Sequence, residues 1–371
     1  MIRRYLPKSA EELVHWYERY ISPVSLIAGF LADNYILLRR VDLWQSNLLL
    51  FSYLGIAALG ILAINLIESG RLPSRAMFRE RVIGVSPFIP VVVQFSFGGL
   101  FSGYLSLYSR SAAFPLSWIF VIALAALLLG NERFVRLYRR FSFQISLYFV
   151  VLFSFLIFFL PVVTRTIGPA IFIISSLLSV SLITLYVRVI NAFAPELVRR
   201  EKTKVARSIA VIFIVFNVLY FSNVIPPLPL ALKDGGVYHS VAKTGATYAL
   251  TGEPLPWYES FFRYNTVFHQ APNEEAVAWS AVFAPSGLST VIFHEWQHYD
   301  EGAKEWLTTN TERFAITGGR DGGYRGYSIK GNLAPGSWRV NVVTQYGQVI
   351  GRISFIVENV ATSTPTVVFE K

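Results

Sequence analysis

The sequence predicts an α-helical membrane bundle of about seven transmembrane helices, followed by an all-β domain. Three observations indicate this fold class. Hydrophobic residues make up 53% of the 371 residues and charged residues only 15%, against about 25% charged residues in ordinary soluble domains. In the first 225 residues the apolar residues lie in runs of roughly 20, long enough to cross a bilayer. After residue 225 the runs shorten and become rich in β-branched and aromatic residues, which favours strands.

The segment 1–20 is predicted to be a short cytoplasmic amphipathic helix on the membrane surface. Ser9 and Glu12 have the spacing of a helix capping box. Leu13, Trp16 and Tyr20 then fall on one helical face, as in helices that lie in a membrane interface. An ordinary amphipathic helix packed against the protein fits the same pattern.

Seven apolar segments between residues 21 and 225 are predicted to span the membrane. They comprise residues 21–38, 45–67, 86–108, 113–130, 143–163, 167–187 and 208–225. Gln94 and Asn217 lie near mid-span, where hydrogen bonds between helices are the usual role of amide side chains. Gly99 and Gly103 form a GxxxG pair, which is expected to allow two helices to pack closely.

The distribution of basic residues predicts the topology of these spans. Residues 1–225 contain 22 Lys and Arg against 10 Asp and Glu, whereas residues 226–371 contain 11 against 13. Alternate connections carry 18 basic residues, and the connections between them carry 4. The positive-inside rule then places the N-terminus in the cytoplasm and the C-terminal domain outside the inner, cytoplasmic membrane. The net charge of +10 therefore indicates a lipid bilayer as partner rather than nucleic acid.

A linker and an extracytoplasmic β-domain are predicted after the last span. Three prolines and a Gly-Gly pair between residues 226 and 236 indicate a linker. The β-domain is expected at 237–361 and a tail at 362–371. Predicted strands are 277–284, 289–299, 306–317, 324–330, 338–345 and 349–357, with Tyr346 and Gly347 in the turn of a hairpin. Short strands separated by turn residues predict an immunoglobulin-like sandwich.

The segment HEWQH, residues 294–298, matches the zinc-protease motif HExxH. On a helix, His294 and His298 would share a face and bind zinc, and Glu295 would activate water. The surrounding residues favour a strand, on which residues four apart lie roughly 13 Å from each other. One zinc ion cannot bridge that distance. The interpretation adopted is a strand with no metal site, and a membrane-anchored metalloprotease is the alternative.

The glycine-rich stretch 318–326 does not match a phosphate loop. Arg320, Tyr324, Arg325 and Tyr327 are the candidate binding residues there, because arginines beside tyrosines form an edge suited to an anion or a sugar. The alternative is a plain glycine-rich turn with solvated arginines. The sequence has no cysteine, which excludes disulfides and thiolate catalysis. No cofactor is predicted.

The C-terminal part resembles a known bacterial family, the domain of unknown function 2914, over residues 275–358. The matching residues, in order, are His294, Trp296, Arg325, Ser328, Lys330, Gly336, Trp338, Val340, Gly347 and Phe355. The resemblance implies a β-sandwich-like module tethered to membrane segments, with the histidine and tryptophan on a strand. The family has no established activity, so the resemblance implies no catalytic residue.

The leading hypothesis is therefore a non-enzymatic membrane protein that displays a β-domain for binding an envelope protein or a glycan. A third possibility, beside the metalloprotease, is a small-molecule transporter or sensor in the helix bundle. Asp33 would be its key residue, because charges inside spans are costly and mark functional sites. The expected structural role of Asp33 is an ion pair with Arg39 or Arg40 at the membrane interface.

Overall fold

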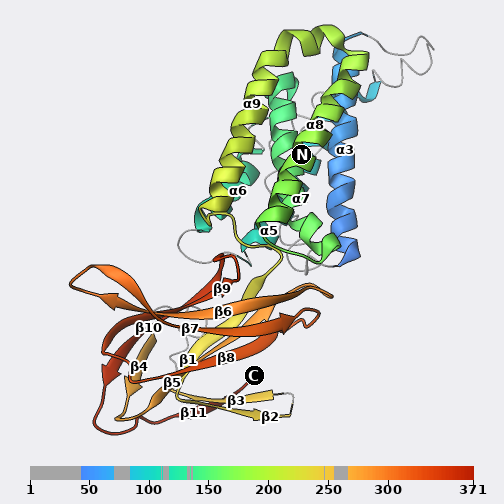
Figure 1. Cartoon of the computed structure of the whole chain (residues 1–371). Coiled ribbons are helices and arrows are strands. Elements are labelled where there is room, and N and C mark those ends of the chain that lie inside the picture. The colour runs from blue at the N-terminus through green and yellow to red at the C-terminus, as the bar shows by residue number, and fades with distance from the viewer. Residues whose placement is uncertain are drawn as a thin grey trace, which may run out of the picture. The chain divides into compact units, whose positions relative to one another are not determined.

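The computed structural model describes residues 43–70, 84–109, 111, 117–131, 134, 137–245, 247–254 and 266–371. The chain divides into a helical unit and a β-rich unit that contains Ile225–Lys371, and Figure 1 shows the elements of each. The predicted surface helix 1–20, the predicted span 21–38 and Asp33 lie outside the described residues, as do Arg39 and Arg40.

The helical unit contains six α-helices among the described residues. They are α3 (Trp44–Glu68), α5 (Ile89–Ser109), α6 (Trp118–Asn131), α7 (Phe141–Thr164), α8 (Pro169–Phe193) and α9 (Pro195–Phe221), with the short 3-10 helices η4 (Ser86–Phe88) and η6 (Leu137–Arg139). Five are long and apolar enough to cross a membrane, counting η4 with α5. At 14 residues, α6 is shorter than a usual span. The predicted count of seven spans is thus not confirmed.

Helix α7 forms the centre of the helical unit, because aromatic and aliphatic residues cover it on nearly all sides. Of its most apolar window, 72% is buried, against 17% to 50% for the other four candidate spans. Tyrosines on α5 donate hydrogen bonds to its backbone: Tyr104 Oη to Val151 O at 2.8 Å and Tyr108 Oη to Ser154 O at 3.0 Å. A helix that is apolar all round is suited to such a buried position.

The polar residues expected to join helices behave differently from one another. At Gln94 the backbone carbonyl on α5 accepts a hydrogen bond from Asn131 Nδ2 of α6 at 3.0 Å, so this contact does not test the role predicted for the amide side chain. Asn217 Nδ2 instead donates to Phe213 O in its own helix, at 2.8 Å. Gly99 faces α3, and a Cβ there would lie 2.5 Å from the ring of Tyr53. The predicted close packing at Gly99 is therefore confirmed.

Helices α8 and α9 form a hairpin joined at Ala194, which differs from the expected boundaries. The predicted loop between 187 and 208 is helical on both sides of this residue. Pro195 explains the turn, because proline restricts the residue before it and is well suited to the first helical position. The first half of α9 carries the basic residues that were expected in a loop.

The β-rich unit consists of three sheets. Its strands are β1 (Ala231–Tyr238), β2 (Ser240–Thr244), β3 (Thr247–Gly252), β4 (Thr266–Gln270), β5 (Glu275–Phe283), β6 (Ser289–Asp300), β7 (Glu305–Thr317), β8 (Tyr324–Gly331), β9 (Gly336–Thr344), β10 (Val349–Asn359) and β11 (Val367–Glu370). The sheet orders are β1-β5-β8, β4-β10-β9-β6-β7 and β11-β3-β2. All six predicted strands are present, and Gly347 turns the β9–β10 hairpin with a positive φ of 75°.

The three sheets stack with β5 in the middle layer. On one side, Ala276 and Ala278 of β5 share a buried core with Trp296, Trp338 and other residues of the five-stranded sheet. On the other side, Trp279 of β5 packs in a second core against residues of β1 and β3. Because both faces of β5 are covered, its sequence is almost continuously apolar rather than alternating. The immunoglobulin-like, two-layer sandwich is not confirmed.

Two segments expected to lack regular structure contain strands. Strand β1 begins at Ala231, inside the predicted linker, and pairs with β5. Gly235, which was expected to loosen a linker, lies within this strand. A Cβ at this position would lie 3.0 Å from Ile353 Cδ1 of β10, so the glycine permits close packing. Strand β11 lies in the predicted tail and pairs with β3. Both strands depend on partners distant in sequence, which composition does not reveal.

Candidate functional site

His294 lies at the centre of a buried hydrogen-bond network between two sheets. Its Nε2 is 2.8 Å from Ser280 Oγ of β5, and its Nδ1 is 2.9 Å from Ser328 Oγ of β8. Trp296 Nε1 donates to the same Ser328 Oγ at 2.9 Å. Because the indole nitrogen only donates, all four groups are satisfied when Ser328 donates to Nδ1 and His294 Nε2–H donates to Ser280.

Burial keeps the His294 imidazole neutral. The side chain is 0% exposed, and Phe314 packs edge-on against the ring with centroids 4.8 Å apart. Desolvation by burial lowers the pKa of His294 from 6.5 to about 3, because a buried charge loses its hydration. A neutral, fully hydrogen-bonded histidine links the two sheets at a defined register, as buried polar networks do.

The HExxH residues lie on strand β6, as the composition predicts. His298 packs against Trp338 with ring centroids 4.8 Å apart. Glu295 is paired in register with Asn341 and Thr311. Successive strand residues point to opposite faces, so Glu295 and His294 lie on opposite faces of the sheet. The described residues contain no group of three or more His, Cys, Asp or Glu that could hold a metal ion.

The four residues of the predicted binding edge do not form one surface. The guanidinium of Arg320 lies over the ring of Tyr324, 5.7 Å from its centroid. Tyr324 and Tyr327 are an odd number of residues apart on β8 and therefore point to opposite faces. Tyr327, 43% exposed, packs instead near Tyr248 of β3, and Arg325 shares its face of the strand.

The glycines of this stretch have structural roles. A Cβ at Gly318 would lie 1.8 Å from Pro285 O, and a Cβ at Gly326 would lie 2.5 Å from the ring of Phe314. Gly323 has a positive φ of 85° and lies against the backbone of β5. Close backbone approach therefore accounts for three of the glycines, without any ligand.

The other family-motif residues also have structural contacts. Trp338 Nε1 donates to Ala334 O at 2.7 Å, and the ammonium of Lys330 lies 5.8 Å from the centroid of the Trp338 ring. Phe355 is 1% exposed and packs edge-on against Trp296 with centroids 6.2 Å apart. Trp338 and Phe355 thus belong to the buried core of the five-stranded sheet.

Histidines and glutamates alternate in a second polar cluster of the β-rich unit. His239 Nδ1 is 2.7 Å from Glu274 Oε1, and its Nε2 is 3.4 Å from Glu253 Oε1. Glu253 Oε2 is 2.7 Å from His269 Nδ1, and His269 Nε2 is 3.8 Å from Glu358 Oε2. These contacts connect the ends of β1, β3, β4 and β10.

The outer face of the five-stranded sheet carries a group of polar and aromatic side chains that we call the arginine–aromatic face. It is built by Gln297 and Tyr299 of β6, Trp306 of β7, Arg339 and Asn341 of β9, and Arg352 of β10. The register places these residues together: Gln297 pairs with Thr308 and Arg339, Tyr299 with Trp306, and Asn341 with Arg352. Strands β6 and β7 are long and form a hairpin at this sheet (Figure 1).

Amide side chains hold the two arginines of this face in place. Gln297 Oε1 accepts hydrogen bonds from Arg339 Nε at 2.7 Å and from Asn341 Nδ2 at 3.1 Å. Asn341 Oδ1 accepts one from Arg352 Nε at 2.8 Å. The Arg339 guanidinium also stacks on Trp306, 4.1 Å from the ring centroid. In each arginine Nε is thus held by an amide, while the terminal nitrogens carry further donors.

The arginine–aromatic face carries two arginines, and Glu295 lies on the same face of β6, paired with Asn341. Partial burial, and secondarily the nearby Arg352 charge, lower the pKa of Arg339 to about 10, so the Arg339 guanidinium is charged at neutral pH. Within the described parts of the chain, no carboxylate forms an ion pair with Arg339. A charged guanidinium without such an ion pair can bind an anion.

Sequence reasoning did not find this face. The alternation in 338–342 identifies Arg339 and Asn341 as residues on the opposite side of the strand from Trp338. It does not reveal which residues of other strands lie beside them. Arg339 meets Gln297 across 42 positions in the sequence, and only the pairing of β6 with β9 brings them together.

Comparisons with known proteins give one informative match. The curated proteins contain no match. Among solved structures, the Pseudomonas fluorescens alkylpurine DNA glycosylase AlkC bound to DNA containing an abasic site analog aligns at 11% sequence identity. The alignment covers 83% of this chain and 97% of that chain, and its TM-score of 0.19 is too low for any argument about fold or function. Residues 289–357 match the family model "Protein of unknown function (DUF2914)", which confirms the resemblance for strands β6 to β10.

Proposed function

We propose that the β-rich unit is a non-enzymatic module that binds an acidic glycan of the cell envelope through the arginine–aromatic face. The observation that carries this proposal is the pair of arginines held by amide oxygens on one sheet face. Guanidinium groups bind carboxylates in a fork geometry. Guanidinium N–H groups can also donate hydrogen bonds to sugar hydroxyls. An acidic sugar polymer supplies both groups in one ligand.

The helical unit, on this proposal, anchors the module in the inner membrane and the β-rich unit lies on the extracytoplasmic side. The lengths and hydropathy of five helices support a membrane location. The excess of basic residues in alternate connections supports the orientation. A soluble domain tethered in this way would meet envelope polymers directly.

The metalloprotease alternative has less support. Both ring nitrogens of His294 lie within hydrogen-bond distance of serine hydroxyls, so neither is directed at an open site. Glu295 lies on the other face of the strand. A role in transport through Asp33 draws no support from the described residues.

Binding to oligogalacturonate, an oligomer of a sugar acid, tests the glycan proposal. The full chain in detergent should bind it more tightly than a neutral glucan of equal length. Arg339→Ala should weaken the affinity about tenfold or more, because a charge-assisted hydrogen bond contributes roughly 1.5–3 kcal/mol. Arg339→Lys keeps the charge but loses the fork and should give an intermediate affinity. Isothermal titration calorimetry measures the affinities of the wild-type chain and of the two Arg339 variants.

Arg320→Ala is the matched control, because it removes an arginine from the same unit but not from the arginine–aromatic face. It should leave the affinity unchanged. Equal losses in Arg320→Ala and Arg339→Ala would indicate a general charge effect and would refute the proposed site. Equal binding of the charged and neutral oligomers would refute the ligand class.

The proposed orientation has its own test. A chain fused after Lys371 to alkaline phosphatase, which is active only outside the cytoplasm, should show phosphatase activity. The same chain fused after Lys371 to green fluorescent protein should not fluoresce, because green fluorescent protein exported in the unfolded state does not become fluorescent. The opposite pattern in the two fusions would place the β-rich unit in the cytoplasm and would contradict an envelope ligand.

A further inference from the structure

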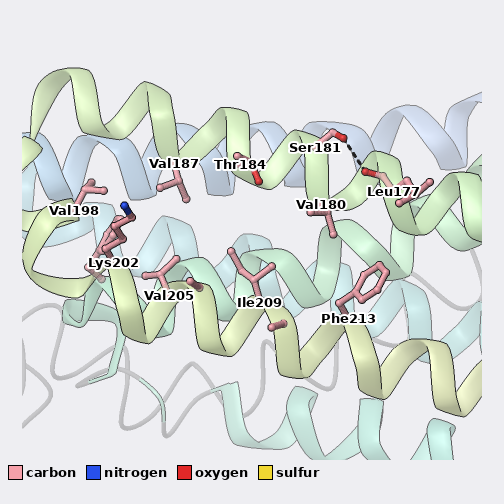
Figure 2. Close-up of a pocket in the computed structure, with 13 residues that line it drawn as sticks. Leu177, Val180, Ser181, Thr184, Val187, Val198, Lys202, Val205, Ile209 and Phe213 are labelled. Atoms are coloured by element: carbon pink, nitrogen blue, oxygen red, sulfur yellow. Dashed lines mark hydrogen bonds between the residues drawn. The ribbon is translucent and has the colours of Figure 1, made fainter.

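Helices α8 and α9, together with Phe141 of α7, line an open apolar groove of about 580 Å³ (Figure 2). Its walls come from one face of each helix, including Leu177 and Val180 of α8 and Val205, Ile209 and Phe213 of α9. The volume is within the range of about 300–1,000 Å³ that is usual for ligand pockets. Ser181, which also lines the groove, donates its hydroxyl to Leu177 O of its own helix at 2.8 Å. The walls therefore suit an apolar chain.

Small residues on α9 create the groove. Ala206 and Ala210 lie one turn apart on the face that lines it, and residues four apart share a helical face. Neither alanine fills the space between the helices. The face of α9 that lines the groove therefore has a gap at these two alanines.

One end of the groove carries a positive charge. Lys202 lines the groove near Val198, at the opposite end from Phe213 and Leu177 (Figure 2). Lys204, two residues further along, instead forms an ion pair with Glu201 at 3.0 Å. In the described part of the chain, no carboxylate forms an ion pair with Lys202.

The length of the groove matches one leaflet of a membrane. Lys202 and Phe213 are about 16 Å apart along the axis of α9, at about 1.5 Å per residue. Half of a hydrocarbon core of about 30 Å is about 15 Å. A molecule that joins an anionic headgroup to an acyl chain therefore fits both the charge at one end and the apolar length.

We propose that this groove is a binding site for an anionic phospholipid, with an acyl chain along Val205 to Phe213 and the phosphate at Lys202. Basic residues between membrane helices are a recurring feature of sites for anionic lipid headgroups. The inference goes beyond glycan binding and shares with it only the membrane location of the helical unit. It concerns a different unit of the chain and a different ligand.

Native mass spectrometry of the full chain tests the headgroup contact. Detergent-purified chain is incubated with equal amounts of phosphatidylglycerol and phosphatidylethanolamine of identical acyl composition. The wild-type chain should retain more phosphatidylglycerol. Lys202→Gln should reduce that retention about fivefold, the effect of one basic residue at a membrane surface. Lys204→Gln is the matched control and should behave as wild type. Equal effects of the two substitutions would overturn the site.

Filling the groove tests the acyl-chain contact. Ala206→Phe is expected to reduce retention of both lipids. If this variant loses its helical circular dichroism signal, Ala210→Phe replaces it with the same expected result. Val211→Phe, at a position that is 54% exposed and not part of the groove, should change neither. Unchanged retention in a folded groove-filling variant would refute the proposal. Oligogalacturonate binding by the same preparations separates this result from a failure of the proposed glycan site.

Discussion

Acidification from pH 6.5 to pH 3 is expected to cost the β-rich unit about 4 kcal/mol through His294 alone. The folded pKa of His294 is about 3 and the unfolded value is 6.5. Between these values the unfolded chain binds one proton more than the folded chain, so the free energy of unfolding falls as the pH falls. The contribution of His294 is complete above pH 6.5 and is lost progressively towards pH 3.

Hydrogen–deuterium exchange of peptides covering β6 can measure this effect in the full chain. After correction for the intrinsic pH dependence of amide exchange, the free energy of opening should fall by about 1.4 kcal/mol per pH unit below pH 6. His294→Gln lowers stability at neutral pH but should remove this part of the slope. If the variant keeps the wild-type slope, His294 is not the group that titrates.

His298→Gln is the matched control for His294→Gln, and it also separates the structural role from the zinc alternative. His298 is not fully buried, so its substitution should leave both the slope and the stability nearly unchanged. Metal analysis of the purified chain completes the test. Stoichiometric zinc that is lost from both variants would overturn the structural role proposed for the HExxH residues.

Trp296→Ala is the second substitution with a large expected effect, a loss of about 3–5 kcal/mol in the free energy of unfolding. The side chain is 0% exposed and fills the core between the sheets. Its removal leaves a cavity beside Phe355 and takes away the donor that hydrogen-bonds Ser328 Oγ. Hydrogen–deuterium exchange measures this loss, which should appear as reduced protection of the amides of β5, β6 and β8.

Trp306→Ala provides the comparison, because Trp306 lies on the neighbouring strand but on the outer, partly exposed face. The expected loss of stability is below about 1 kcal/mol. This variant should weaken oligogalacturonate binding instead, since Arg339 loses the ring on which it stacks. Equal destabilisation by the two substitutions would contradict the assignment of Trp296 to the core and Trp306 to a binding face.

The predicted binding edge and the arginine–aromatic face differ in how their residues are spaced along the sequence. Arg320, Tyr324, Arg325 and Tyr327 are close in sequence, and a sequence alone groups residues only by such closeness. On a strand, however, neighbours point to opposite faces. A surface on a sheet is built across strands, so the residues of the arginine–aromatic face come from four separate segments between Gln297 and Arg352.

The local sequence pattern was sufficient to predict those helices and strands whose burial repeats regularly along the element. Apolar runs predict the helices α3, α5, α7 and α8 to within a few residues except at the end of α8, because each run must be buried in protein or lipid along its whole length. Alternation and turn residues likewise predict β6 to β10 and the strand placement of the HExxH residues. For the same reason, the sequence alone indicated a structural rather than catalytic role for His298.

Long-range pairing decided the rest, because the free energy of those contacts depends on residues far apart in the chain. The strands β1 and β11, the central layer formed by β5, the serine partners of His294 and the gap between α8 and α9 all require the packed molecule. No window of the sequence contains both members of such a pair. Composition therefore predicts which residues are buried, while only folding determines which of them meet.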